Sequence, residues 1–147
     1  MHAAQGRIQE EKQNKGNKME KNNSTEDYLE SILILHKNKG FARSVDVAKE
    51  LGVTRPSVSN AMKKLREKEM IYFSDKGHIF FTDAGKAIAE KVYRKHLLIK
   101  KILMNMGGNE NMAAREACVI EHAICDETYE CLSAYYDTHW AVSGSNA

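Results

Sequence analysis

The chain has 147 residues, of which 42% are hydrophobic and 29% are charged, and its formal net charge is +2. This length allows one domain or two small ones. No apolar run approaches the length of a membrane span, and no secretory signal opens the chain, so we expect a cytoplasmic protein without a membrane partner.

The N-terminal stretch divides into a polar leader and a first helix. Residues 1–23 are rich in Gln, Asn, Lys and Glu, and we predict that they are disordered. The first helix is expected to begin at the N-cap pair Ser24 and Thr25 and to end near Lys37. A single proline and the absence of long alternating strand patterns favour a mainly α-helical protein.

A helix-turn-helix pattern follows. Ser44 is expected to cap a short helix that stops before Gly52, where a sharp reversal of the chain needs a glycine. Thr54 is expected to cap the next helix, and Pro56 lies in its first turn, where proline is favoured. The spacing of the apolar residues gives that helix one buried face.

A hairpin and three further helices are predicted next. Two β-prone runs at 71–73 and 79–81 are separated by five polar residues that include a glycine, a pattern typical of a β-hairpin. Helices are then expected at 83–105, with Thr82 as N-cap, at 112–124 and at 126–136, the last two opening near Met112 and at Asp126 as N-cap. We assign no structure to the tail, residues 141–147.

A short helix, a glycine turn, a second helix and a hairpin are together typical of a winged helix-turn-helix DNA-binding domain. The start of the second helix lies in the major groove in this motif, where Arg55 suits guanine and Asn60 suits adenine. Lysines further along this helix and at the hairpin tip suit the DNA backbone. The predicted DNA-binding residues are Ser44, Thr54, Arg55, Pro56, Ser57, Ser59, Asn60, Lys63, Lys64 and Lys76. Taken alone, such lysines are more often an ordinary solvated face.

A metal-ligand pattern lies near the C-terminus. Cys118, Glu121 and His122 stand at i, i+3 and i+4 and share one face of a helix. Thiolate, carboxylate and imidazole groups are ligands of transition metals. Because metal ions usually take four to six ligands, further ligands are expected from elsewhere in the chain.

Three other residues are candidates for these ligands, and each also has a structural interpretation. Asp27 and Glu30 lie one turn apart on the first helix, but Asp27 also suits a helix N-terminus and Glu30 also suits a solvated surface. His96 also suits a basic surface patch. Cys125 and Cys131 are interpreted as small buried residues without a ligand role.

In this order and spacing, the motifs resemble the diphtheria toxin repressor and manganese transport regulator family of metal-dependent repressors. The resemblance covers nearly all of residues 24–137. It rests on Thr25-Glu26-Asp27-Tyr28-Leu29-Glu30, the winged helix, Arg-Lys-His-Leu-Leu at 94–98 and C-x-x-E-H at 118–122. It implies a winged helix-turn-helix at 24–82 and an all-helical dimerisation and metal-binding domain at 83–140. The implied metal ligands are Asp27, Glu30, His96, Cys118, Glu121 and His122.

Two residues depart from the pattern of the manganese branch of this family. Cys118 stands where classical manganese regulators have glutamate, whereas iron-type members, and some manganese-type members, carry cysteine. Lys100 stands where many members have glutamate, so an accessory metal site that uses this acid is not expected. The chain resembles the short type of the family, without the SH3-like domain of longer members.

The resemblance implies a repressor rather than an enzyme. We expect Mn²⁺, or alternatively Fe²⁺ or Zn²⁺, as corepressor, and a homodimer that binds a palindromic operator in double-stranded DNA and controls metal-uptake genes. One alternative is a winged-helix regulator that senses an oxidant or a small molecule through cysteine. A metal-dependent hydrolase is more remote, because the chain has no H-E-x-x-H helix or nucleophile elbow. A third alternative is a protein-interaction module.

Overall fold

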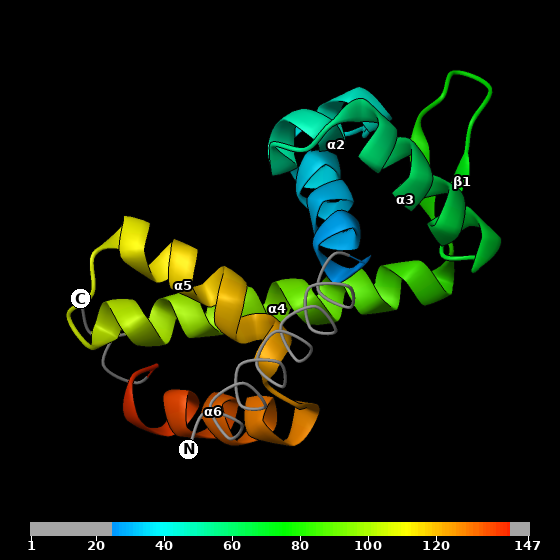
Figure 1. Ribbon diagram of the computed structural model, residues 1–147. Coiled ribbons are helices and arrows are strands. Elements are labelled where there is room, and N and C mark those ends of the chain that lie inside the picture. The colour runs from blue at the N-terminus through cyan, green and yellow to red at the C-terminus, as the bar shows by residue number, and fades with distance from the viewer. Residues whose placement is uncertain (1–24, 142–147) are drawn as a thin grey trace, which may run out of the picture. The chain divides into compact units, whose positions relative to one another are not determined.

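A computed structural model describes residues 25–141, which are mainly α-helical (Figure 1). The predicted leader and all of the predicted tail except Ala141 lie outside the described residues. The elements are a helix over residues 25–39, α2 (Ser44–Leu51), α3 (Arg55–Glu67), β1 (Ile71–Phe73), β2 (Ile79–Phe81), α4 (Asp83–Asn105), α5 (Glu110–Ala123) and α6 (Asp126–His139). The predicted fold class is confirmed. None of the described helices is long and apolar enough to cross a bilayer.

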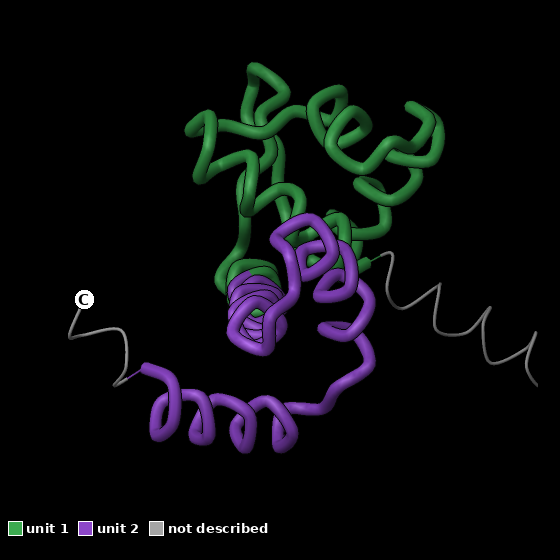
Figure 2. The backbone as a smooth tube through the Cα atoms, turned by 90° about the vertical axis from the view of Figure 1, so that its left-hand side faces the viewer, with its two compact units in different colours: residues 1–89 green, residues 90–147 purple. Residues whose placement is uncertain are grey.

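The chain divides into two compact units, and the division falls within α4 (Figure 2). Unit 1 ends at Ala89, and unit 2 begins at Glu90. Unit 1 contains the helix over 25–39, α2, α3, the hairpin and the start of α4. Unit 2 contains the remainder of α4 together with α5 and α6.

The core of unit 1 is formed by apolar side chains that recur every three or four residues along its helices. Each large aliphatic side chain that is fully buried contributes roughly 1.5–3 kcal/mol relative to an exposed one. The hairpin adds the inward-facing residue of each strand. The largest buried apolar side chains of this core are Leu29, Ile32, Val47, Val58, Met62, Ile71 and Ile79.

The two helices of the helix-turn-helix begin and end at well-defined residues. Gly52 follows α2 in the left-handed conformation, with a φ of 65°, and its N–H donates to the carbonyl of Ala48. The Thr54 side chain accepts a hydrogen bond from the backbone N–H of Ser57, as predicted for the cap of α3. The prediction of Ser44 as N-cap is wrong by one residue, because Arg43 holds that position. The Arg43 carbonyl already accepts a hydrogen bond from the N–H of Val47, so the first turn closes there.

The hairpin forms at the predicted residues. Its strands are antiparallel, and the central pair is Tyr72 with Phe80. Gly77 in the turn has a φ of 76°, and its N–H donates to the carbonyl of Ser74. His36, on the helix over 25–39, donates from Nε2 to the carbonyl of Ile79 at 2.7 Å. This bond anchors the hairpin to the helix that carries two candidate metal ligands.

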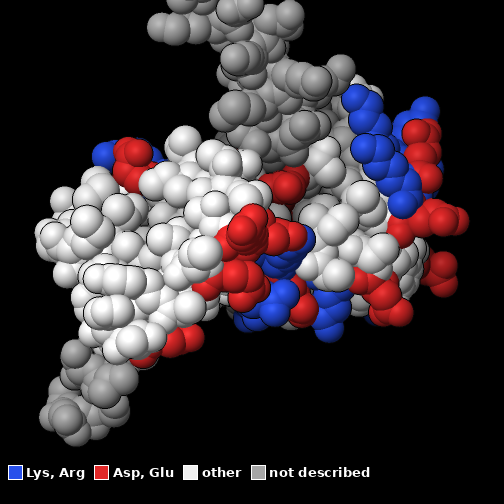
Figure 3. Space-filling model, turned by 90° about the horizontal axis from the view of Figure 1, so that it is seen from below, with Lys and Arg blue, Asp and Glu red and all other residues white. Residues whose placement is uncertain are grey.

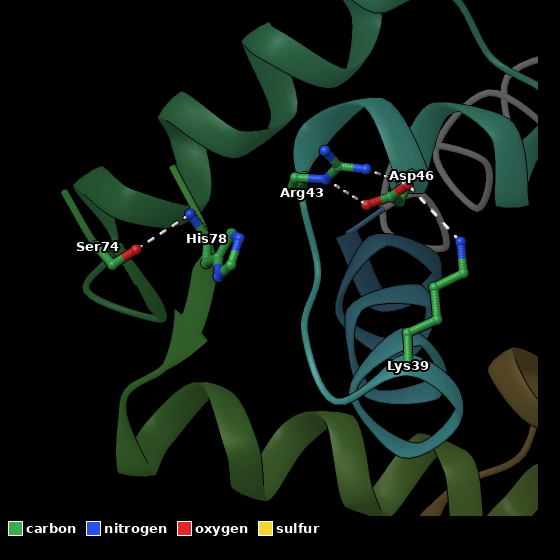
Figure 4. A network of polar contacts seen from close by, with 5 residues as sticks. All are labelled: Lys39, Arg43, Asp46, Ser74 and His78. Atoms are coloured by element: carbon green, nitrogen blue, oxygen red, sulfur yellow. Dashed lines mark hydrogen bonds and ion pairs between the residues drawn. The ribbon is translucent and has the colours of Figure 1, made fainter. Parts of the chain in front are cut away.

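A polar network surrounds Asp46 in the first turn of α2 (Figure 4). Asp46 is buried, with 4% of its side chain exposed, and it accepts a hydrogen bond from Arg43 Nε at 3.0 Å. Lys39 lies on its other side, 3.8 Å from the carboxylate. The hydrogen bond from Arg43 holds the pKa of Asp46 below its usual value. The Arg43 guanidinium also lies over the ring of Phe41, which stacks on His78 next to the hairpin turn.

The first turn of α4 packs directly against backbone. Thr82 caps the helix as predicted, because its hydroxyl oxygen accepts a hydrogen bond from the Gly85 N–H. The same hydroxyl donates to the carbonyl of Glu69 at 2.6 Å. A Cβ atom at Gly85 would lie 1.9 Å from the carbonyl oxygen of Met70. Glycine is therefore required at position 85 because two backbone segments meet there.

In unit 2, three helix boundaries differ from the prediction. α5 begins before Met112, because Asn109 Oδ1 accepts a hydrogen bond from the Met112 N–H and acts as the cap. At the start of α6 the N-cap is Cys125, and the predicted cap Asp126 is the first helical residue. α6 continues past the predicted end at Tyr136 to His139.

None of the described residues of α6 is buried. Cys125 and Cys131 are both exposed, so the prediction that they are small buried residues is wrong for the described chain. Large apolar side chains of unit 2 are also exposed, among them Met106 and Tyr135. Figure 3 shows a face on which a broad area carries neither acidic nor basic side chains.

Candidate metal centre and DNA-binding surface

Three potential ligands converge within unit 2. His96 lies midway along α4, and Cys118 and Glu121 lie one turn apart on α5. His96 Nδ1 is 2.8 Å from Glu121 Oε2 and 3.7 Å from Cys118 Sγ. One ligand atom from each of the three residues lies within 4.8 Å of the others. The structure thus brings together the imidazole, the thiol and the carboxylate that were predicted as ligands.

His122 lies beside the same carboxylate. Its Nε2 atom is 3.3 Å from Glu121 Oε1, whereas His96 faces Oε2. The side chains of Glu121 and His122 are 1% and 3% exposed. Each carboxylate oxygen of Glu121 therefore has an imidazole nitrogen close to it, and the carboxylate itself is almost fully buried.

This donor set suits a divalent transition metal. A carboxylate removed from water is costly unless positive charge or hydrogen bonds compensate for it. Imidazole nitrogen, thiolate sulfur and carboxylate oxygen together bind Zn²⁺ and Fe²⁺ and, through the oxygen ligands, Mn²⁺. His96 Nδ1 and Glu121 Oε2 are joined by a hydrogen bond in this structure, so a cation bound by both atoms would take the place of the hydrogen between them. The residues present therefore fit a metal ion.

Unit 1 holds the other two predicted ligands. Asp27 and Glu30 lie on the helix over 25–39 at i and i+3, so they share one face of that helix. Glu30 is 6% exposed, and Asp27 is partly exposed. A carboxylate as buried as that of Glu30 is unusual for a solvated surface residue.

Lys100, which stands where many members of the family have glutamate, forms an ion pair. Lys100 Nζ lies 3.0 Å from Glu110 Oε1, which joins α4 to the start of α5. An ammonium group at this place does not coordinate a cation.

The predicted DNA-binding residues lie on the outer face of α3 and on the hairpin. α3 buries Val58, Met62 and Leu65. The structure also brings Ser44 of α2 close to Arg55 and Ser59, because all three line a hollow of about 390 Å³. The predicted residues that are exposed are Thr54, Arg55, Pro56, Ser57, Ser59, Asn60, Lys63, Lys64 and Lys76.

One residue close to the ligand cluster of unit 2 was not predicted from the sequence. Lys95 precedes His96 in α4, and its ammonium group reaches the carbonyl of Ile124 and the carboxylate of Asp126. Its neighbours in sequence suggested only a basic patch. Its partners lie 29 and 31 residues further along the chain, so only the fold reveals the contact.

A winged helix-turn-helix joined to a helical unit that carries metal-type ligands defines a class of proteins, the metal-dependent DNA-binding transcriptional regulators. The chain belongs to the iron-dependent repressor family. Residues 22–79 match the N-terminal DNA-binding domain of that family, and residues 82–139 match its metal-binding and dimerisation domain. The family comprises transcriptional regulators and not enzymes.

Relatives and solved structures agree with this assignment. The transcriptional regulator MntR of Escherichia coli O157:H7 is 30% identical over 116 residues, which are 79% of this chain and 75% of that protein. An HTH-type transcriptional regulator of Methanocaldococcus jannaschii is 34% identical over 116 residues, which are 78% of this chain and 93% of that protein.

Among solved structures, the manganese regulator SloR is 30% identical, with a TM-score of 0.69 over 77% of this chain and 53% of that one. ScaR with bound Zn²⁺ is 32% identical, with a TM-score of 0.65 over 77% of this chain and 53% of that one. The chain thus spans about half the length of these solved structures.

Proposed function

We propose that the protein is a transcriptional repressor that binds operator DNA when a divalent metal ion, with Mn²⁺ favoured, occupies its ligand cluster. One observation carries this proposal: the ligand atoms of His96, Cys118 and Glu121 lie within 4.8 Å of one another in unit 2. In a winged helix-turn-helix protein of this family, such a cluster suits a corepressor better than a catalytic ion.

The proposed ligands come from both units. Asp27 and Glu30 would contribute carboxylates from unit 1, and His96, Cys118, Glu121 and His122 would contribute from unit 2. When bound, the ion supplies positive charge that compensates for the clustered carboxylates and the thiolate. A ligand set drawn from both units favours one arrangement of the DNA-binding unit. Occupancy of the site and affinity for DNA are then coupled reciprocally, typically by about 1–3 kcal/mol.

We propose further that the protein acts as a homodimer in the cytoplasm. The matched dimerisation domain and the absence of buried residues from the described α6 support association of two copies. A twofold-symmetric dimer suits a palindromic operator, whose half-sites lie about 34 Å apart, one turn of DNA. Genes for metal uptake are the proposed targets, because repression under metal excess would then limit entry of the metal.

An electrophoretic gel-shift titration tests the proposal. Purified protein is titrated onto candidate operator DNA with Mn²⁺, and in parallel with a chelator. We expect about 5- to 150-fold tighter binding with Mn²⁺, the range of a 1–3 kcal/mol coupling. Equal affinity under both conditions would refute a metal corepressor. Release of DNA by an oxidant, unaffected by chelator, would instead support a cysteine-based sensor.

The identity of the metal depends on Cys118. The carboxylates favour a hard ion such as Mn²⁺, while the thiol and the imidazoles favour Fe²⁺ or Zn²⁺. Replacing Cys118→Glu should weaken binding of Zn²⁺ relative to Mn²⁺, which calorimetric titration of both metals measures. Cys131→Ser, at an exposed cysteine of α6, is the matched control. An unchanged metal preference in Cys118→Glu would remove this thiol from the proposed ligands.

A further inference from the structure

Lys95 is a buried lysine beside the ligand cluster of unit 2. Its relative exposure is 8%, although lysine is almost never fully buried unless it is paired. Its Nζ atom donates to the backbone carbonyl of Ile124 at 3.1 Å and lies 3.2 Å from Asp126 Oδ1. The side chain thus crosses from α4 to the junction of α5 and α6.

These contacts fix the C-terminal end of α5. Ile124 is the C-cap of α5, where carbonyl groups have no partner within the helix. A lysine ammonium group is favourable at such an end because it also faces the negative pole of the helix. Asp126 gains a second ion pair from Lys91, and the hydrogen bonds from Lys91 and Lys95 lower the pKa of its carboxyl group.

The same two helix segments carry the proposed ligands. Lys95 directly precedes His96 on α4, and Ile124 follows His122 by two residues on α5. Successive residues of a helix point about 100° apart, so Lys95 and His96 leave α4 in different directions. The contact of Lys95 with Ile124 therefore joins α4 to the end of α5 about one helical turn from the point where His96 Nδ1 and Glu121 Oε2 lie 2.8 Å apart.

We propose that Lys95 is a positioning residue of the metal centre, which holds the α5 ligands at coordination distance from His96 through its bonds to Ile124 and Asp126. The inference rests on the proposed metal site. Groups that hydrogen-bond directly to metal ligands typically change metal affinity by about 10–100-fold when they are lost, and we expect Lys95, which acts through the end of α5, at the lower end of this range. Lys95 differs from a coordinating group because its ammonium donates and does not accept.

A purely electrostatic role of Lys95 predicts the opposite sign. An ammonium group near a bound cation repels it, so removing the charge would then tighten metal binding. A positioning role predicts weaker binding, because the end of α5 loses its attachment to α4. The direction of the change in affinity therefore distinguishes the two roles.

The experiment compares metal binding by the full chain and three variants. Lys95→Met keeps the length of the side chain without the ammonium group, and Lys95→Arg keeps a cationic donor. Lys91→Met is the matched control, because it removes the exposed partner of Asp126 and leaves the bond to Ile124 intact. Calorimetric titration with Mn²⁺ gives affinity and stoichiometry, and circular dichroism in chelator gives helix content and thermal stability.

We expect Lys95→Met to bind Mn²⁺ about tenfold more weakly, with unchanged stoichiometry and wild-type helix content. Lys95→Arg should recover most of the affinity, and Lys91→Met should stay within about twofold of wild type, as expected for an exposed ion pair. Excess Mn²⁺ should restore DNA binding by Lys95→Met.

Three results would overturn the inference. They are wild-type or tighter Mn²⁺ binding by Lys95→Met, an equal loss of affinity in Lys91→Met, and a loss of stability in chelator with no change in affinity. If Lys95→Met does not fold, Lys95→Gln, which is too short to reach both partners, gives the same test. Absence of Mn²⁺ binding by the wild type would refute the proposed function, whereas wild-type binding unchanged in the variant refutes only the role of Lys95.

Discussion

The helix-turn-helix of unit 1 and the facing segments of α4 and α5 form their polar contacts over very different sequence distances. Asp46 bonds to Arg43, three residues earlier, and Thr54 bonds to Ser57, three residues later. His96 bonds to Glu121 across 25 residues, and Lys95 bonds to Ile124 across 29. The first region is therefore built from local sequence signals, while the second exists only once two helices have packed together.

The largest expected effect tests whether the stability of unit 1 also depends on a contact between segments that are further apart in the sequence. Gly85→Ala places a Cβ atom 1.9 Å from the carbonyl oxygen of Met70, so backbone must move. We expect a loss of about 3 kcal/mol or more in the free energy of unfolding, at the upper end for overpacking. Urea denaturation followed by circular dichroism measures it.

Gly40→Ala is the control for that measurement. Gly40 has a φ of 79° but has no atom within 4 Å of an added Cβ, so only backbone strain of about 1–2 kcal/mol applies. If Gly85→Ala is no less stable than Gly40→Ala, the close contact between α4 and Met70 does not determine the free energy of unfolding of unit 1.

A second change tests the region built from long-range contacts. Glu121→Gln keeps the shape of the side chain but removes the charge between His96 and His122. We expect Mn²⁺ affinity to fall about 100-fold or more, equivalent to roughly 2.7 kcal/mol. Stability in chelator should change little, because the amide keeps the shape of the side chain and has both a donor and an acceptor for the two imidazoles.

Calorimetric titration and thermal unfolding with and without Mn²⁺ measure both quantities for Glu121→Gln. Glu116→Gln, at an exposed position of α5, serves as the control. Mn²⁺ affinity within threefold of wild type would exclude Glu121 as a ligand.

The smallest of these effects concerns the local network of α2. Asp46→Asn should lower the free energy of unfolding by about 2 kcal/mol at pH 7, because hydrogen bonds to charged groups contribute roughly 1.5–3 kcal/mol. The pKa of Asp46 in the folded state lies below its ordinary value of 3.8. The carboxylate therefore stabilises the fold above about pH 3.8, and this contribution is lost as the pH falls through the folded-state pKa.

Denaturation at several pH values checks this dependence. The difference between wild type and Asp46→Asn should shrink as the pH falls below 3.8. Asp75→Asn, at the exposed turn of the hairpin, should have little effect at any pH. A difference that stays constant from pH 7 to pH 3 would contradict the ionic role of Asp46.

Most of the fold was predictable because its signals are local. Thr54 and Thr82 cap the helices that they were expected to cap, and the two strands form at the predicted residues. Helix boundaries were predicted wrongly where the residue at the N-cap position gave only a weak sequence signal. Asn109 caps α5 through its amide oxygen, and Arg43 precedes α2 without any side-chain cap.

The candidate site was predictable only in part. Helical spacing placed Cys118 and Glu121 on one face, but their distance from His96 depends on how α4 and α5 pack. The exposure of Cys125 and Cys131 was not predictable from residue type, because cysteine is usually buried and α6 has no buried residues. The burial of Lys95 was not predictable, because the sequence does not distinguish a solvated lysine from a buried one within a basic stretch.

The exposure of α6 has a consequence for the energetics of the protein. Isolated helices shorter than about 12–15 residues are marginal in water, and α6 has 14 residues, none of them buried in the described chain. If a second copy covers α6, its helicity follows mass action, so it rises with protein concentration and falls on dilution. The equilibrium constant for folding of α6 would then have units of concentration, whereas that for folding of the winged helix would have none.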